Sequence, residues 1–327
     1  MNNITPKETA IVICSYKNRT NVLFDYLNNI KDFDVYIVVR TNDYNESGYD
    51  KYEFNDNIKF LKSDNLHNVT DTRWFGHQEI MKLGYRGMIM IDDDIRGKYI
   101  YYITPETKRT TSNSYKPLKA SVEETCKYII QKANEYDAAF ASPTFGTNIG
   151  FKKPNKIKLN TGLTCCAFTF HNLDYCRQYN ITYDINNPKI LEDLDVVIQY
   201  LFRGLNCITI DYYGVLTNFD TDLSLVVNKD DGYTELILNT YLKYRDYVSI
   251  TVKKTGILGI RINWKKIYNA FVNGLSEQYI LENEYHNKLY DLCKQYIEAN
   301  KEERKLIDKE IRSLIINTSN NEKNRTK

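Results

Sequence analysis

The sequence predicts an α/β fold, in which a mostly parallel sheet is sandwiched by helices and followed by a C-terminal helical extension. Short apolar runs recur along the first two thirds of the chain, and their nearly continuous hydrophobicity is typical of strands covered on both faces. Segments with apolar residues at helical spacing lie between these runs. Such an alternation of strands and helices favours a parallel sheet.

The predicted strands and helices follow one another in chain order. The clearest strand patterns are residues 10–14, 35–39, 58–61 and 88–91, with weaker ones at 138–141 and 207–210. Three helices between them are predicted from apolar stripes: Val22, Leu23, Tyr26, Leu27 and Ile30; Phe75, Ile80, Leu83 and Gly84; and Val122, Cys126, Ile129, Ile130 and Ala133. A further helix is expected at Glu192–Arg203, with Gly204 as its stop.

The character of the chain changes after about residue 230, where helical patterns dominate. A strand-like basic stretch, residues 248–264, interrupts them. We predict a catalytic domain over residues 1–264, a helical extension over 265–316 and a disordered, polar tail over 317–327. The polar segment 99–119 is expected to form a long loop.

Composition and charge narrow the class of protein. The 327 residues include 44 Lys and Arg against 42 Asp and Glu, a formal net charge of +2, which excludes a uniformly basic nucleic-acid binder but allows local basic patches. The seven cysteines lack metal-site spacing and are expected to be buried free thiols. No signal-peptide pattern or membrane-spanning run is found, so we expect a cytoplasmic protein without a membrane partner.

Three adjacent aspartates, Asp92, Asp93 and Asp94, directly follow the apolar run MIMI. Ligands of parallel α/β sheets bind beyond the carboxyl ends of strands, and buried carboxylates need a neutralising partner. Carboxylate oxygens are ligands that suit Mg²⁺ or Mn²⁺. Successive side chains of an extended strand point to opposite faces, so Asp92 and Asp94 point the same way. We therefore predict Asp92 and Asp94 as metal ligands and Asp92 and Asp93 as donor-binding residues. The alternative is an exposed acidic turn.

Two stretches before the aspartates carry residues suited to a nucleotide. In IVICSYKNR, Ser15 and Tyr16 could hold a base and Arg19 a phosphate, although an ordinary helix start would look the same. In NVTDTRWFG, Arg73 has a guanidinium suited to phosphate or to a carboxylate of the cluster. Trp74 is expected in the core, with a stacking role as the alternative.

An acidic motif, LEDLD, begins the helix expected at residue 192. Carboxylates in a first helical turn are favoured by the helix dipole, so Asp193 or Asp195 could simply cap the helix. Asp193, or Glu192 beside it, could also act as a general base that takes the proton of an attacking hydroxyl. Both interpretations stay open on the residues alone.

Together and in this order, these stretches resemble the GT-A (Rossmann-like) class of nucleotide-sugar glycosyltransferases over about the first 220 residues. AIVICSYKNR looks like the first strand and nucleotide loop, Asp92 and Asp94 match the DxD metal motif, and Asp193 matches the catalytic base. The resemblance implies a UDP-sugar donor, with UDP-glucose as first choice, an Mn²⁺ or Mg²⁺ cofactor and an inverting reaction. Many enzymes of this class use a late histidine as the third metal ligand, but no histidine of this sequence lies in a suitable position. The third ligand is therefore expected to be water, Asp220 or Asp222.

A narrower resemblance rests on IVICSYKNRTNVL, the triple aspartate and GIRINWKK. These look similar to phage-type DNA glycosyltransferases that are associated with TET/JBP oxygenases and related to the base J glucosyltransferase. The resemblance implies transfer to the hydroxymethyl group of 5-hydroxymethyluracil or 5-hydroxymethylcytosine in DNA, in the host cytoplasm if the chain is phage-encoded. Two basic sets could contact such DNA: Lys253, Lys254, Arg261, Lys265 and Lys266, or Lys152, Lys153, Lys156 and Lys158.

Two other functions remain compatible with the same motifs. A GT-A enzyme acting on a surface glycan, a teichoic acid or a protein would share every donor-site residue. A non-catalytic sugar-nucleotide-binding protein would use LEDLD only as a helix cap. The motifs encode neither the sugar nor the oligomeric state.

Overall fold

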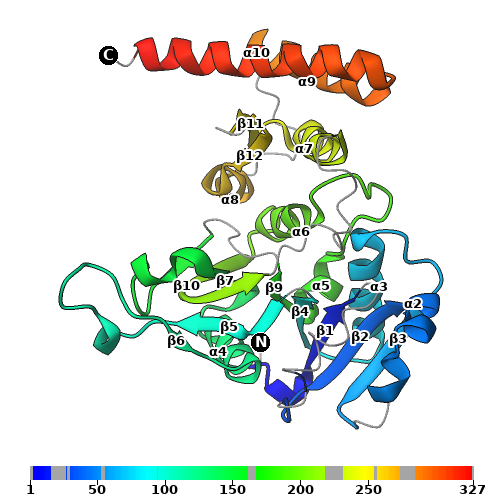
Figure 1. Ribbon diagram of the computed structural model, residues 1–327, viewed down its shortest axis with the longest axis vertical. Coiled ribbons are helices and arrows are strands. Elements are labelled where there is room, and N and C mark those ends of the chain that lie inside the picture. The colour runs from blue at the N-terminus through cyan, green and yellow to red at the C-terminus, as the bar shows by residue number, and fades with distance from the viewer. Residues whose placement is uncertain are drawn as a thin grey trace. The chain divides into compact units, whose positions relative to one another are not determined.

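A computed structural model of the chain describes residues 3–15, 27, 30–52, 56–93, 95–160, 167–217, 231–253, 256–272 and 284–325. The chain divides into two compact units. The first comprises Met1–Asn186 and Val196–Leu225, and the second comprises Asn187–Asp195 and Val226–Lys327 (Figure 1).

A ten-stranded sheet forms the centre of the first unit, with strand order β3-β2-β1-β4-β9-β7-β10-β5-β6 and β8 paired with β10. The six strands predicted from apolar runs correspond to β1, β2, β3, β4, β7 and β10. The strands are β1 (Thr9–Cys14), β2 (Asp34–Arg40), β3 (Ile58–Ser63), β4 (Gly87–Asp92), β5 (Ile95–Tyr102), β6 (Leu118–Lys119), β7 (Ala138–Phe145), β8 (Ile157–Leu159), β9 (Phe168–Asn172) and β10 (Asn206–Thr217).

Strand directions in this sheet are mixed. Strands β3, β2, β1 and β4 are parallel neighbours, and β7 is parallel to β10. Strand β9 lies between β4 and β7 and is antiparallel to both, so β4 and β7 run in the same direction. The carboxyl ends of β1, β4, β7 and β10 therefore meet one edge of the sheet, where the sequence places its candidate site.

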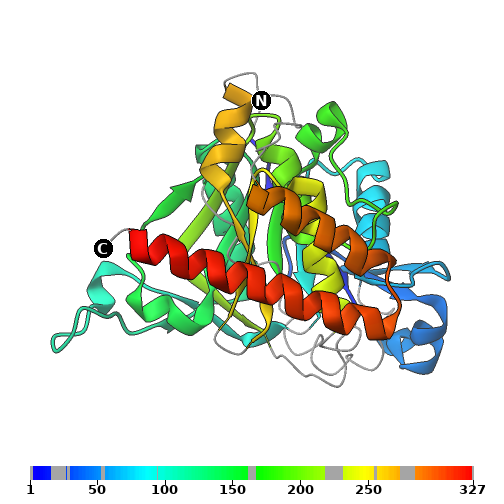
Figure 2. The same cartoon turned by 90° about the horizontal axis from the view of Figure 1, so that it is seen from above.

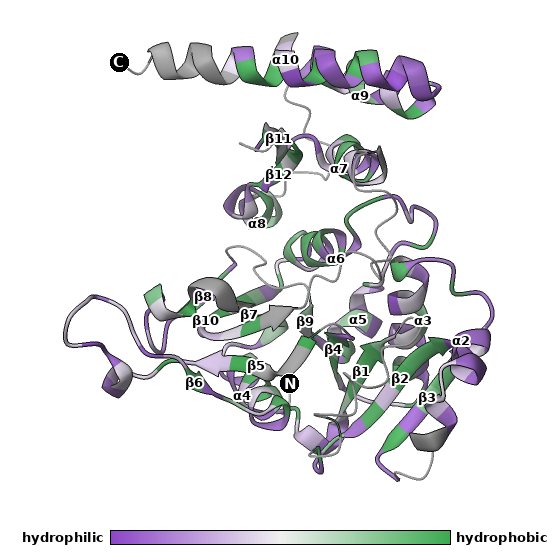
Figure 3. Cartoon of the chain, viewed as in Figure 1, coloured by the Kyte–Doolittle hydropathy of each residue, from purple (hydrophilic) through white to green (hydrophobic). Residues whose placement is uncertain are grey.

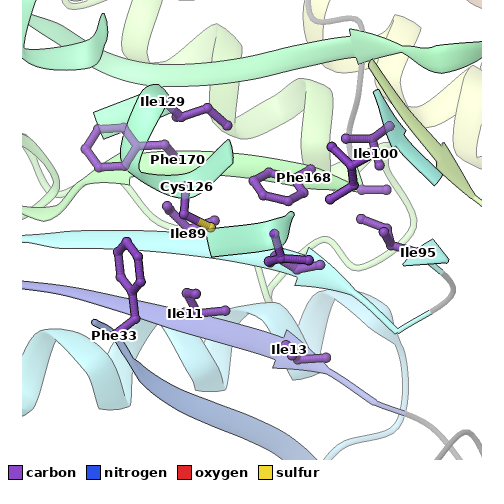
Figure 4. Packing of buried hydrophobic residues seen from close by; sticks show 14 of the residues in the cluster. Ile11, Ile13, Phe33, Ile89, Ile95, Ile100, Cys126, Ile129, Phe168 and Phe170 are labelled. Carbon is purple, nitrogen blue, oxygen red and sulfur yellow. The ribbon is translucent and has the colours of Figure 1, made fainter. Parts of the chain in front are cut away.

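Helices cover both faces of the sheet, which explains the continuous apolar runs. Helix α3 (Val69–Lys82) contacts β1 and β2, and a Cβ added at Gly76 would lie 2.9 Å from Val38 Cγ2 and 3.0 Å from Val12 Cγ1. The alternate residues, such as Ile11 and Ile89, face the other way, toward α4 (Val122–Glu135), as Figure 4 shows. Figure 3 shows β1 and β2 as hydrophobic stretches of the sheet.

The predicted apolar stripes have different outcomes. All five residues of the stripe in α4 are buried, as predicted. The stripe at residues 75–84 is right only for Ile80, which is fully buried; Leu83 is 55% exposed, and the rest of the buried face of α3 carries Gly76 and polar side chains, including Arg73 and His77. In the first stripe, Leu27 and Ile30 are buried, and its other members lie outside the described residues.

Short elements complete the first unit. Strand β5 takes up the start of the predicted loop, which then runs from residue 103 to 117. The short helices are η1 (Pro6–Glu8), α2 (Thr41–Glu46), η2 (Tyr49–Tyr52), η3 (Pro105–Thr107), η4 (Gly146–Phe151) and α5 (Leu173–Tyr179). Helix α6 (Glu192–Leu201) begins in the second unit and ends in the first.

The second unit contains a two-stranded antiparallel sheet and four helices among its described residues. Helices α9 and α10 pack side by side (Figure 2). Helix α10 runs to Arg325, so most of the segment predicted as a disordered tail has helical backbone. None of the helices that the structure describes is long and apolar enough to span a membrane. The elements are α7 (Asp231–Tyr244), β11 (Val248–Val252), β12 (Leu258–Ile262), α8 (Trp264–Val272), α9 (Glu284–Glu298) and α10 (Lys301–Arg325).

Candidate active site

Asp92 is the last residue of β4, at the carboxyl edge of the sheet. Its backbone pairs with Cys14 at the end of β1, and its amide N–H donates to the carbonyl oxygen of Ala167 at 2.9 Å. The Asp92 side chain is 29% exposed. The strand therefore delivers a fixed, partly open carboxylate to the edge where ligands of such sheets bind.

Arg73 faces this carboxylate from α3. Alternation along β4 turns Asp92 toward the face that α3 covers, and the close contact at Gly76 holds the helix against the sheet. Nη2 of Arg73 lies 2.8 Å from Oδ1 and 3.0 Å from Oδ2 of Asp92. The Arg73 side chain is almost wholly buried, so its charge is directed at the Asp92 carboxylate and at whatever binds there.

Asp93 points to the other face and has its own partners. The hydroxyl of Ser15, just beyond β1, donates to Oδ2 of Asp93 at 3.2 Å and lies 2.6 Å from the phenol of Tyr49. Ser15, Asp93 and Tyr49 are all buried. The alternation of the strand predicts this separation of Asp93 from Asp92. Tyr49 carried no signal in the sequence, because it is one of 28 tyrosines.

A buried histidine pair lies behind Arg73 on the same face of the sheet. The rings of His77, one turn along α3, and His171 of β9 are 6.0 Å apart. His171 lies 3.0 Å from the phenol of Tyr200, whereas neither ring nitrogen of His77 has a hydrogen-bond partner among the described residues. Burial, with a smaller contribution from Arg177, lowers the pKa of His77 to about 4. Burial also lowers the pKa of His171, so both histidines are neutral at physiological pH.

The acidic motif belongs to the second unit and separates into two environments. Asp195 is fully buried, 2.6 Å from Lys243 Nζ and 2.5 Å from the Tyr244 phenol, so it is a structural ion-pair partner. Asp193 is half-buried, and its carboxylate accepts the backbone N–H of Leu194 at 2.8 Å. Glu192 is half-buried in the same first turn.

The structure brings together four of the predicted donor-site residues and leaves others undescribed. Ser15 contacts Asp93, Arg73 contacts Asp92, and the two aspartates are adjacent. Trp74, predicted in the core, is half-buried. The predicted site residues that lie outside the described residues are Tyr16, Arg19, Asp94, Asp220, Asp222 and, in the first basic set, Lys254.

Asp92 is the described residue that fits a divalent cation. A carboxylate offers about four lone-pair sites, so the contact with Arg73 leaves further positions on the partly exposed oxygens of Asp92. Oxygen donors of this kind are those that Mg²⁺ and Mn²⁺ prefer. Among the described residues, no three His, Cys, Asp or Glu side chains gather as a metal-ligand group.

The fold and the edge site define a protein of the GT-A class. The structure of GalNAc-T7 with UDP, GalNAc and Mn²⁺ matches with a TM-score of 0.50 at 9% identity, over 89% of this chain and 54% of that one. The chain thus spans about half the length of that protein. The TET-associated glycosyltransferase family matches residues 9–234, and the chain belongs to this family.

Other comparisons are weaker. A 4-diphosphocytidyl-2C-methyl-D-erythritol synthase from Anaerococcus prevotii matches with a TM-score of 0.39 at 9% identity, over 72% of this chain and 95% of that one. A CMP:2-keto-3-deoxy-manno-octonic acid synthetase with CTP matches with a TM-score of 0.36 at 10% identity, over 62% and 88% of the two chains. The comparison with curated proteins gives no match.

Proposed function

We propose that the chain is a metal-dependent enzyme that transfers a sugar from a UDP-sugar to a hydroxyl acceptor. The observation that carries this proposal is the partly open carboxylate of Asp92, backed by the buried guanidinium of Arg73. The pair lies at the carboxyl edge of the sheet and within the residues that match the glycosyltransferase family. A carboxylate can bind the metal ion while the neighbouring guanidinium contacts phosphate oxygens, so the pair suits a metal-bound diphosphate.

The donor site is proposed to combine three kinds of contact. Ser15 and Tyr16 hold the uracil and ribose, Arg19 and Arg73 contribute positive charge to the diphosphate, and Asp93 fixes Ser15. Asp92 and Asp94 would hold Mn²⁺ or Mg²⁺. Such an ion, when bound, offsets the negative charge that develops on the leaving diphosphate. UDP-glucose is the first donor to test.

Asp193, with Glu192 as the second choice, is proposed as the general base. Asp195 is engaged with Lys243 and Tyr244 and is buried, which leaves the half-buried carboxylates of the motif for the chemistry. Asp193 takes the proton of the acceptor hydroxyl while its oxygen forms the new bond to the anomeric carbon. The bond from that carbon to the diphosphate breaks and UDP leaves from the opposite face, which inverts the anomeric centre.

The proposed acceptor is the hydroxymethyl group of 5-hydroxymethyluracil or 5-hydroxymethylcytosine in DNA. Membership of a TET-associated family supports this choice. A surface glycan, a teichoic acid or a protein is the alternative acceptor, because the donor-site residues would be the same. A non-catalytic sugar-nucleotide-binding protein is the second alternative.

Donor binding and transfer test the assigned residues separately. Calorimetry of UDP-glucose binding with Mn²⁺ should detect binding by the wild type and by Asp193→Asn, and no metal-dependent binding by Asp94→Ala. Only Asp193→Asn should bind the donor and yet fail to transfer sugar. Asp291→Asn, an exposed aspartate of α9, is the matched control and should behave as the wild type. Normal turnover by Asp94→Ala would exclude the metal assignment.

The acceptor is distinguished by UDP release. Duplex DNA with hydroxymethylated pyrimidines should accelerate UDP release from the donor, whereas unmodified DNA and simple glycans should not. Acceleration by a glycan alone would favour the first alternative. UDP-glucose binding without release in the presence of any acceptor would favour the second.

A further inference from the structure

A basic surface is built from two segments of the first unit. Residues 104–119 and 151–159 hold eight of the chain's 44 basic residues and one of its 42 acidic residues, Glu106. The rest of the chain therefore holds 36 basic and 41 acidic residues and is net negative. The small net charge of the whole protein conceals a concentrated positive region, defined by Lys108, Arg109, Lys116, Lys119, Lys152, Lys153, Lys156 and Lys158.

The two segments are joined in the fold. The backbone N–H of Tyr115 donates to the carbonyl oxygen of Gly150 at 2.7 Å, which places the loop after β5 beside η4. Asp211 of β10, which is buried, lies 2.9 Å from Lys158 Nζ and 3.7 Å from Lys152 Nζ. This carboxylate holds the second segment in place, while Lys153 and Lys156 remain exposed.

An aromatic ring projects from this surface. Phe151, at the end of η4, is 78% exposed, more than any other large hydrophobic side chain among the described residues. It directly precedes Lys152 and Lys153. An exposed ring beside lysines suits a polyanion that also offers flat aromatic groups, because bases stack on aromatic side chains while lysines contact phosphates. Nucleic acid has both properties.

Topology places one part of this surface, the end of η4 with Phe151, at the same sheet edge as Asp92. The loop of residues 103–117 follows β5, which is antiparallel to β10, and it meets η4 through the hydrogen bond between Tyr115 and Gly150. Helix η4 directly follows the carboxyl end of β7, which runs in the same direction as β4. Four strand spacings of about 4.8 Å separate β4 from β8, a span of about 19 Å. One helical turn of duplex DNA is about 34 Å long, so one duplex can contact both places.

We infer that this surface binds the phosphate backbone of duplex DNA, and that Phe151 stacks on a base beside the acceptor site. The inference rests on the proposed function and specifies how the acceptor is held. The other basic set, at residues 253–266, is a weaker candidate, because Lys266 Nζ donates to the carbonyl oxygen of Asp246 at 2.7 Å and thus holds its own unit together.

Salt-dependent binding tests the surface without relying on catalysis. Fluorescence anisotropy measures binding of a labelled duplex with one hydroxymethylated pyrimidine between 50 and 200 mM salt. In Lys153→Gln/Lys156→Gln, the slope of log K against log salt should become shallower by about 2, and affinity at low salt should fall roughly tenfold or more. Phe151→Ala should weaken binding roughly tenfold at every salt concentration without changing the slope.

Matched controls distinguish the failure of this inference from the failure of the proposed function. Lys7→Gln/Lys82→Gln removes the same charge from exposed lysines at the opposite sheet edge, before β1 and β4, and should leave the slope unchanged. Transfer to a free hydroxymethylated nucleoside should be unchanged in Lys153→Gln/Lys156→Gln. If neither the wild type nor any variant transfers sugar, the proposed function is wrong, but the binding data still test the surface.

Two results would overturn the inference. One is that Lys153→Gln/Lys156→Gln has the same slope of log K against log salt as the wild type, or that the Lys7→Gln/Lys82→Gln control loses as much slope and affinity. The other is full competition by an anionic polymer without bases, such as a teichoic acid, together with unchanged binding by Phe151→Ala.

Discussion

Nη2 of Arg73 contacts both carboxylate oxygens of Asp92, at 2.8 Å and 3.0 Å. The contact joins α3 to the end of β4 and sets a nearly buried cation against a partly exposed anion. A charged pair in this position has two functions. It stabilises the junction of helix and strand, and it orients the carboxylate that we propose contacts the donor.

The coupling between Arg73 and Asp92 is the first testable consequence. Arg73→Gln should lower the free energy of unfolding by about 2 kcal/mol, because a hydrogen bond between charged groups is lost. Asp92→Asn should cost a similar amount, and the double variant should cost less than the two single effects added together. Urea unfolding of all four proteins gives the coupling energy, and additive single effects would show that the pair does not interact in solution.

The pH dependence of stability should report His77. Its pKa is lowered to about 4 by burial, whereas an unfolded chain has about 6.5, so the unfolded state binds more protons between these values. The free energy of unfolding should therefore fall as the pH falls through this window. From pH 7 to pH 5 the contribution of His77 is about 2 kcal/mol.

The replacement His77→Leu isolates this contribution. Urea unfolding at pH 7 and pH 5 should show a smaller loss of stability for His77→Leu than for the wild type, because the leucine does not titrate. His67→Leu, at an exposed position, is the matched control. An identical pH difference in His77→Leu and the wild type would mean that another group causes the acid sensitivity.

The acidic motif should separate into a structural and a chemical residue. Asp195→Asn should reduce stability by about 3 kcal/mol, because it leaves the charge of Lys243 without its buried partner. Replacing both residues, as Asp195→Leu/Lys243→Met, should restore much of that loss. Asp193→Asn should change the free energy of unfolding by less than about 0.5 kcal/mol. A large loss of stability in Asp193→Asn would assign that residue a structural role.

The close packing at Gly76 predicts a steric effect. Gly76→Ala would place a Cβ 2.9 Å from Val38 Cγ2, so α3 must move away from the sheet. We expect a loss of about 1–3 kcal/mol in stability and weaker donor binding, because Arg73 moves with the helix. The additional change Val38→Ala removes the nearest atom and should recover part of both losses. Equal donor affinity in Gly76→Ala and the wild type would show that the helix position does not control the site.

The parallel part of the fold was predictable from the sequence because burial on both faces leaves a clear signal. Strands β1, β2 and β4 read as uninterrupted apolar runs, since Val12 and Val38 pack under α3 while Ile11 and Ile89 face the opposite layer. Strand β5 lacks such a run, with Arg96, Gly97 and Lys98 in sequence. Its place in the sheet depends on pairing with β10, which is a distant contact that periodicity does not encode.

The candidate site was predictable only in part. Alternation along β4 separates Asp92 from Asp93, but no local pattern identifies Tyr49 as the partner of Ser15 or Lys243 as the partner of Asp195. Helix α3 shows the limit most clearly. Its buried face is mostly polar, with Arg73 and His77 turned inward beside the candidate site, so a search for an apolar stripe finds only Ile80 of that face.

The mass of the acceptor after reaction shows whether the protein transfers a sugar to DNA. The protein is incubated with UDP-glucose, Mn²⁺ and a duplex carrying one 5-hydroxymethylated pyrimidine, and the strands are then weighed by mass spectrometry. Other UDP-sugars are tried in parallel. We expect that the modified strand gains the mass of one hexose, that the gain requires Mn²⁺ or Mg²⁺, and that Asp193→Asn abolishes it. An unchanged strand with every donor, or an equal gain by Asp193→Asn, would contradict this expectation.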